Sequence, residues 1–159
     1  MDIVRIIDED DLQTIKDIHD EGSPYIPLAL QNSICWFLCG VACMRIWGYK
    51  KPISMLIHTS QKTDHHKNVA EAVRDWIVSK DSDELIVKCE QVWNEETTQF
   101  TFEKFREQYP QYDRKDDEIN KYPAFEEVRK ELAVLLSKEP TNMPLDEDDE
   151  CPYHGVIHM

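Results

Sequence analysis

Five polar side chains that are close to one another in the sequence are the first candidates for a functional site. They are His58, Thr59, Ser60, His65 and His66. An apolar run at residues 55–57 leads directly into the first three, as expected for a buried strand of a parallel sheet. Because ligands of open α/β sheets collect beyond the carboxyl ends of strands, we expect these side chains to face a ligand or an interface. The alternative is a polar loop whose hydroxyl groups satisfy backbone groups or cap the next helix.

A second candidate is the pair Cys35 and His154, which could act as nucleophile and base in a papain-like cysteine hydrolase. A helix N-terminus lowers the pKa of a thiol, and a later histidine could then remove its proton. The apolar helical pattern, however, begins near Leu28, which places Cys35 inside the helix. No glycine-rich turn precedes the cysteine to form an oxyanion hole. These features favour the alternative of a buried core thiol.

Metal chemistry has two candidate sets of donors. Cys151, His154 and His158 have the spacing C-x2-H-x3-H, which could supply three zinc ligands, but a fourth ligand is not evident. Pairs of acidic residues are also abundant, and nuclease sites hold divalent metals with such side chains. None of these pairs lies between apolar strands in the pattern D…E-x-K. We therefore interpret them as a solvated acidic surface and expect no dedicated metal site and no cofactor in this chain.

The balance of charge limits the classes of partner. The chain has 159 residues, of which 32 are acidic and 18 are basic, and its formal charge is −14. Direct binding of this chain to nucleic acid is therefore not expected, because a phosphate backbone repels such a charge. A protein partner is the alternative, since an acidic face could dock on a basic protein. The five cysteines, without a secretory signal or an apolar run long enough for a membrane helix, indicate reduced thiols in the cytoplasm.

Hydrophobic periodicity predicts the elements that position these residues. Helices are predicted over residues 9–20, 28–47, 65–79, 85–93, 102–109 and 123–136, with Asp64 capping the third and Pro123 in the first turn of the last. Strands are predicted over residues 2–7, 55–59 and 155–159. Together these elements predict a helix-rich α/β fold with a small, partial, parallel-type sheet.

We expect one domain, residues 1–159, with four parts. The parts are a core helix–strand–helix unit at residues 28–80, a helical module at residues 84–138, an acidic linker at residues 140–150 and a terminal strand at residues 151–159.

The segment at residues 26–80 resembles a known family. The positions that carry the resemblance are Pro27, Leu28, Ala29, Leu30, Phe37, Ala42, Arg45, Gly48, the stretch SMLIHTS at residues 54–60, and His66. They resemble the Z-one domain, which is assigned to endonucleases and attached to helicase-like ATPases. A weaker similarity continues through Trp93, Phe102, Phe105 and Tyr109.

The resemblance implies a role and partners. It implies that the chain is a segment of a helicase-like, ATP-dependent DNA-processing protein, with a role in defence against foreign DNA. It also implies that the partial sheet belongs to a helicase-type second lobe, that the remaining domains are partners, and that ATP and a divalent metal bind in the full-length parent.

Two departures from the family pattern lead us to interpret the segment as non-catalytic on its own. The chain lacks the later glycine-rich segment of the family, and it has no G-x-x-x-x-G-K-[ST] phosphate loop. Two alternatives stay open: a papain-like hydrolase that uses Cys35 and His154, and a small acidic inhibitor or immunity protein.

Overall fold

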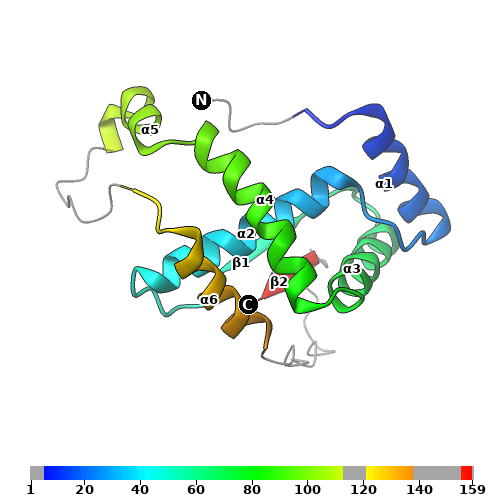
Figure 1. Ribbon diagram of the computed structural model, residues 1–159. Helices are drawn as coiled ribbons and strands as arrows, with labels where there is room; N and C mark the ends of the chain where they lie inside the picture. The colour runs from blue at the N-terminus through cyan, green and yellow to red at the C-terminus, as the bar shows by residue number, and fades with distance from the viewer. Residues whose placement is uncertain (1–5, 113–120, 138–154, 159) are drawn as a thin grey trace.

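The computed structural model describes residues 6–112, 121–137 and 155–158 (Figure 1). Within these ranges the chain forms six α-helices, one 3-10 helix and two short strands, which confirms a helix-rich chain with a small sheet. In chain order the elements are α1 (Glu9–Glu21), α2 (Leu28–Ile46), β1 (Ser54–Ile57), α3 (Thr63–Val78), α4 (Ser82–Gln99), α5 (Phe102–Gln108), the 3-10 helix η1 (Pro110–Tyr112), α6 (Phe125–Leu136) and β2 (Gly155–His158).

Helix α2 lies at the centre of the core and packs against both α4 and α6 (Figure 1). Apolar residues occur on all its sides, and Ile34 and Leu38 are fully buried. Among the described residues, α2 is the helix whose length and mean hydropathy of 1.3 would allow a membrane crossing. Its packing between other helices agrees with the predicted core helix, since a helix that is apolar all round needs neighbours on several faces.

The start of α2 depends on a side chain from α1. The residue before α2 is Pro27, which supplies no capping side chain. The carboxylate of Asp11 takes this place, because its two oxygens accept hydrogen bonds from the backbone N–H groups of Leu28 and Ala29, each at 3.0 Å. A carboxylate there satisfies two donors that have no partner inside the helix and complements the helix dipole. α1 and α2 are thus joined by a polar contact as well as by the core.

The two strands pair antiparallel, which corrects the predicted parallel-type sheet. β2 lies beside β1, with Ser54 opposite His158 and Ile57 opposite Gly155. The burial of β1 gives the reason, because Ile57 is buried whereas Leu56 is 59% exposed. A strand with one covered and one exposed face is typical of antiparallel pairing, whereas parallel strands are covered on both faces. The helicase-type second lobe stays an expectation from the resemblance.

Two predictions about helix starts were wrong by one or two residues. Asp64 was expected to cap α3, but it is the second residue of that helix and Lys62 occupies the cap position. Its charge still lies in the first turn, where the helix dipole favours it. Pro123 was expected in the first turn of α6, but it precedes the cap residue Ala124. There the proline ring favours the extended backbone by which the chain enters the helix.

Several predictions fall partly or wholly outside the described residues. They include residues 2–5 of the first predicted strand, the acidic linker at residues 140–150 and the start of the terminal segment at residues 151–159. Ile6 and Ile7, the last two residues of the first predicted strand, have irregular backbone and are exposed.

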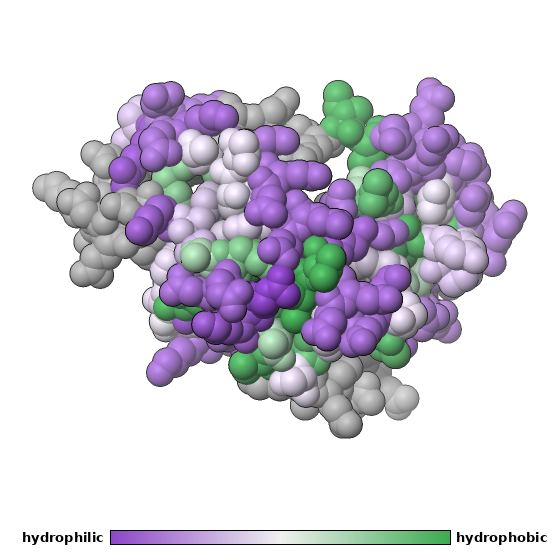
Figure 2. Space-filling model, in the orientation of Figure 1, coloured by the Kyte–Doolittle hydropathy of each residue, from purple (hydrophilic) through white to green (hydrophobic). Residues whose placement is uncertain are grey.

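The molecular surface reflects the excess of charged residues. In the face that Figure 2 shows, hydrophilic side chains predominate and apolar side chains form separate patches. Exposed apolar residues include Tyr25 and Leu28, at the entry to α2.

Candidate functional site

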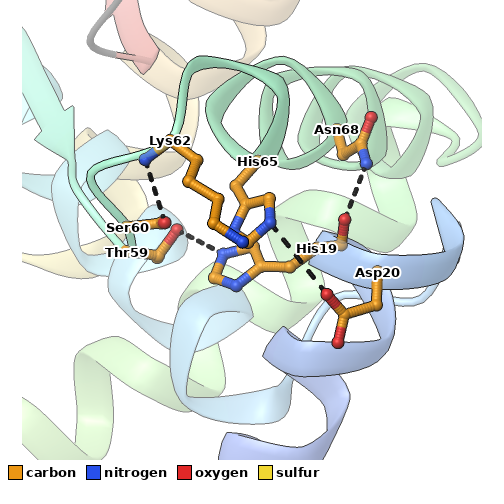
Figure 3. Close-up of polar contacts among 7 residues, drawn as sticks. All are labelled: His19, Asp20, Thr59, Ser60, Lys62, His65 and Asn68. Carbon is orange, nitrogen blue, oxygen red and sulfur yellow. Dashed lines mark hydrogen bonds and ion pairs between the residues drawn. The ribbon is translucent and has the colours of Figure 1, made fainter.

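Residues predicted at the end of β1 meet the end of α1 in the folded chain. Thr59 follows β1, and His65 lies in the first turns of α3. α1 packs against α3, which brings His19 and Asp20 to the same place (Figures 1 and 3). We call His19, Asp20, Thr59 and His65 the histidine cluster.

The contacts in the histidine cluster are short and well defined. Nε2 of His19 lies 2.9 Å from Oγ1 of Thr59, which is hydrogen-bond distance. The rings of His19 and His65 are stacked, with centroids 4.3 Å apart and planes 18° from parallel (Figure 3). The side-chain amide of Asn68 donates to the backbone carbonyl of His19 at 3.1 Å. Three contacts therefore join the last turn of α1 to the loop after β1 and to α3.

Electrostatics in the histidine cluster favour a neutral ring at His19. Burial lowers the pKa of His19 below its ordinary value of 6.5, and the neighbouring His65 lowers it further. His66 and Lys62 act in the same direction, whereas Asp20 raises the pKa. The net direction is downward, because a proton on His19 would be desolvated and would face other positive groups.

His65 has one close contact, the stack with His19, and one weak contact with Asp20. Its Nε2 lies 4.0 Å from the carboxylate of Asp20, whose side chain is 72% exposed, so this pair is a weak surface ion pair at most. Its Nδ1 is buried and has no hydrogen-bond partner among the residues that the structure describes. The stack with His19 is therefore the main contact that orients the ring.

The other three predicted residues lie beside the histidine cluster. His58 is exposed, whereas His66 is buried with 8% exposure, and their ring centroids are 5.1 Å apart. Ser60 is partly buried, and its Oγ accepts a hydrogen bond from the backbone N–H of Lys62 at 3.2 Å. This last contact matches the alternative in which hydroxyl groups of the loop satisfy backbone groups before α3.

The chemistry of the histidine cluster suits a structural tie better than catalysis. A neutral imidazole beside a hydroxyl is the contact of a general base with a nucleophile. In such sites a third group hydrogen-bonds to the base and orients it. Here the ring of His65 stacks on the ring of His19, and the Asp20 carboxylate forms its ion pair with His65. The hydrogen bond and the stack fix α1 on the β1–α3 unit.

Cys35 is placed where a core thiol would be. It is fully buried in α2, and Cys89 in α4 donates from its Sγ to the Cys35 carbonyl at 3.8 Å. Cys39 in turn donates to the carbonyl of Cys89 at 3.7 Å. The contact with the Cys89 thiol and burial raise the pKa of Cys35 far above its ordinary value. A thiol held protonated in this way is a poor nucleophile, and the proposed partner His154 lies outside the described residues.

The predicted zinc ligands are described only in part. Cys151 and His154 lie outside the described residues, and His158 lies in β2 opposite Ser54. In the described part of the chain, no group of three or more His, Cys, Asp or Glu side chains is arranged to hold a metal ion. The histidine cluster is therefore not arranged as a metal centre.

Sequence reasoning missed His19, Asp20 and Asn68. His19 follows Ile15 by four residues and Ile18 by one, so helical spacing places it on the edge of the apolar face of α1. That position is a signal that its ring would be partly covered. The contact with Thr59 joins residues 40 positions apart, which local periodicity does not reveal.

Comparison with known proteins gives one result. Searches of curated proteins and of solved structures found no match. The family model of the Z1 domain matches residues 29–153, from the second residue of α2 to a point beyond α6. This match confirms the resemblance to the Z-one domain that residues 26–80 carry. Because the matched range covers most of the 159 residues, the chain belongs to the Z1 domain family.

Proposed function

We propose that this chain is a non-catalytic segment of a helicase-like, ATP-dependent DNA-processing protein, and that it acts as a scaffold and a surface for partner contact. The observation that carries the proposal is the Z1 domain match over residues 29–153. The attachment of such domains to helicase-like ATPases, and their assignment to endonucleases, are the expectations that the resemblance adds. A role in defence against foreign DNA belongs to the same proposal.

The described side chains support a scaffold role. The thiol of Cys35 is enclosed in the core, and the contact between His19 and Thr59 ties α1 to the loop after β1. Helices α1, α2, α3, α4 and α6 share one hydrophobic cluster, which includes Leu38, Trp93 and Leu132. A segment of this kind can present a rigid surface to other domains.

The glycines of this chain do not fit a nucleotide phosphate site. A phosphate loop needs closely spaced glycines directly before a helix N-terminus. Gly22 follows the end of α1, Gly40 lies inside α2, Gly48 comes after its end and Gly155 begins β2. We therefore place ATP binding, and any divalent metal that accompanies it, in other parts of the parent protein.

The test combines the gene with the isolated chain. The gene should be sequenced on both sides of the codons for residues 1–159, and both the longer product and this chain should be purified. We expect the longer product to encode a phosphate loop and to hydrolyse ATP faster when DNA is added. The isolated chain should hydrolyse no ATP and should not bind duplex DNA in fluorescence anisotropy at low salt. A locus without an ATPase, or cleavage of DNA by this chain alone, would contradict the proposal.

A second candidate function is an acidic inhibitor or immunity protein. The formal charge of −14 favours it, because a strongly acidic surface attracts basic partners. Co-purification of one basic protein, lost on adding moderate salt, together with a locus that encodes no ATPase, would select this candidate over the first.

A further inference from the structure

A groove of about 970 Å³ is lined largely by aromatic side chains, and none of its lining residues belongs to the histidine cluster. We call it the aromatic groove. The N-terminal half of α2, the end of α4 and helix α5 supply its walls. Its aromatic lining consists of Trp36, Phe37, Phe100, Phe102, Phe105 and Tyr122. Pockets with mainly apolar walls and a few polar groups are the usual form of a binding site.

Tyr122 organises the aromatic wall. Its ring lies edge-on to Trp36, with centroids 6.2 Å apart, and tilted against Phe102 at 5.0 Å. Its hydroxyl donates a hydrogen bond to the carbonyl of Phe100 at 2.7 Å, just beyond the end of α4. The rings of Trp36, Phe102 and Tyr122 are therefore held by their mutual packing and by one hydrogen bond, so this wall of the groove has a defined shape before any ligand enters.

In the described part of the chain, one carboxylate lines this groove. Glu96, near the end of α4, is only 8% exposed and is one of the two buried polar residues of the described core. Burial raises the pKa of the Tyr122 hydroxyl, and Cys43 and then Glu96 raise it further. Glu96 also interacts with another group of the chain. A carboxylate has two oxygens and accepts several hydrogen bonds, so a ligand can share it or displace that group.

We propose that the aromatic groove binds an arginine side chain of a basic partner protein. Aromatic faces attract cations, and a guanidinium stacks on rings more readily than an ammonium does. The carboxylate of Glu96 offers a guanidinium the two-point contact that its fork of N–H groups matches. The charge of −14 draws a basic partner towards the surface. This inference does not depend on the proposed role in DNA processing.

The first test uses the unchanged protein and two small probes. N-acetyl-arginine amide is titrated into nitrogen-15-labelled protein, and N-acetyl-citrulline amide, which has nearly the same shape without the charge, serves as the control. We expect the arginine probe to shift the signals of the Trp36 indole and the Thr101 amide, both in the groove lining. The citrulline probe should bind at least about tenfold more weakly, since it loses the charged contact.

The second test uses matched variants. Glu96→Gln should weaken binding of the arginine probe by about tenfold, whereas Glu95→Gln should change it by less than about twofold. Glu95 lies on the same helix and its substitution removes the same charge, but its side chain is exposed and is not part of the groove. Circular dichroism confirms that each variant is folded.

Three results would overturn the proposal. They are equal affinity for the arginine and citrulline probes, equal losses in the two variants, and shifts confined to residues outside the groove. Groove signals that move with protein concentration alone would assign the groove to a second copy of this chain instead. If Glu96→Gln does not fold, the comparison of the two probes on the unchanged protein decides the question.

Discussion

Acidification should lower the free energy of unfolding through His19. The pKa of its ring is lowered in the folded chain, first by burial and then by His65, with smaller effects of the same sign from His66 and Lys62 and an opposing effect from Asp20. The unfolded chain therefore takes up a proton at a higher pH than the folded chain does. The stability that His19 contributes is fully present above its ordinary pKa of 6.5 and is lost as the pH falls from there through the folded-state pKa.

The number of protons that His19 can take up limits the size of this effect. One ring titrates, so the difference between the unfolded and folded chains is at most one proton, which gives an upper limit of ~1.4 kcal/mol per pH unit. His19→Phe keeps an aromatic ring against His65 but cannot titrate, and it should remove this part of the pH dependence. Thr59→Val removes the hydroxyl that lies 2.9 Å from His19. It should cost about 1 kcal/mol at each pH and keep the dependence.

Urea unfolding followed by tryptophan fluorescence measures the effect, with titrations at intervals between about pH 7.5 and about pH 5.5. Most carboxylates titrate nearer pH 4, so this window separates histidine from the 32 acidic residues. Midpoints should be compared at a constant denaturant slope, so that a change reports stability. A wild-type midpoint that does not move, or a His19→Phe curve parallel to that of the wild type, would refute the assignment to His19.

Three further predictions concern the helical core. Asp11→Ala should lower the free energy of unfolding in urea by about 1 kcal/mol, because two N–H groups of α2 lose their acceptor. The control Asp10→Ala, which removes an exposed charge of α1, should lower it clearly less. In the same assay, Leu38→Ala should lower the free energy of unfolding by about 3 kcal/mol, because Leu38 is fully buried. Val87→Ala, at a side chain that is 49% exposed, should lower it by less than about 0.5 kcal/mol, and similar losses in both variants would contradict the burial of Leu38. In a Cys151→Ser variant, iodoacetamide should label the four buried cysteines only as fast as the chain unfolds locally. Mass spectrometry identifies the labelled residue, and rapid labelling of Cys35 in the native protein would support the hydrolase alternative.

The helices could be predicted because their apolar residues follow a 3.6-residue period. The expected helix at residues 9–20 is close to Glu9–Glu21, and the one at residues 28–47 is close to Leu28–Ile46. Both begin or end at strong local signals, such as Pro27 and the left-handed Gly22. Local sequence was sufficient where the element and its end are set by neighbouring residues.

The direction of the sheet could not be predicted, because three successive apolar residues look alike in a strand buried on one face and in a strand buried on both. The exposure of Leu56 depends on what packs above it, which is a tertiary property. The same limit applies to the residues that form the histidine cluster. Thr59 and His65 follow from the strand end, but His19 reaches them only through the packing of α1 on α3.

The range of the family match and the range of the folded unit differ at both ends. The match begins at residue 29 and ends at residue 153, so α1 lies before it and β2 after it. Both of these flanking elements cover the β1–α3 unit, since α1 packs on α3 and β2 pairs with β1. A chain trimmed to the matched range would lose the Asp11 carboxylate that starts α2 and the buried Ile18. Transfer of this segment into another protein should therefore include both flanks, because α1 and β2 complete the packing of the β1–α3 unit.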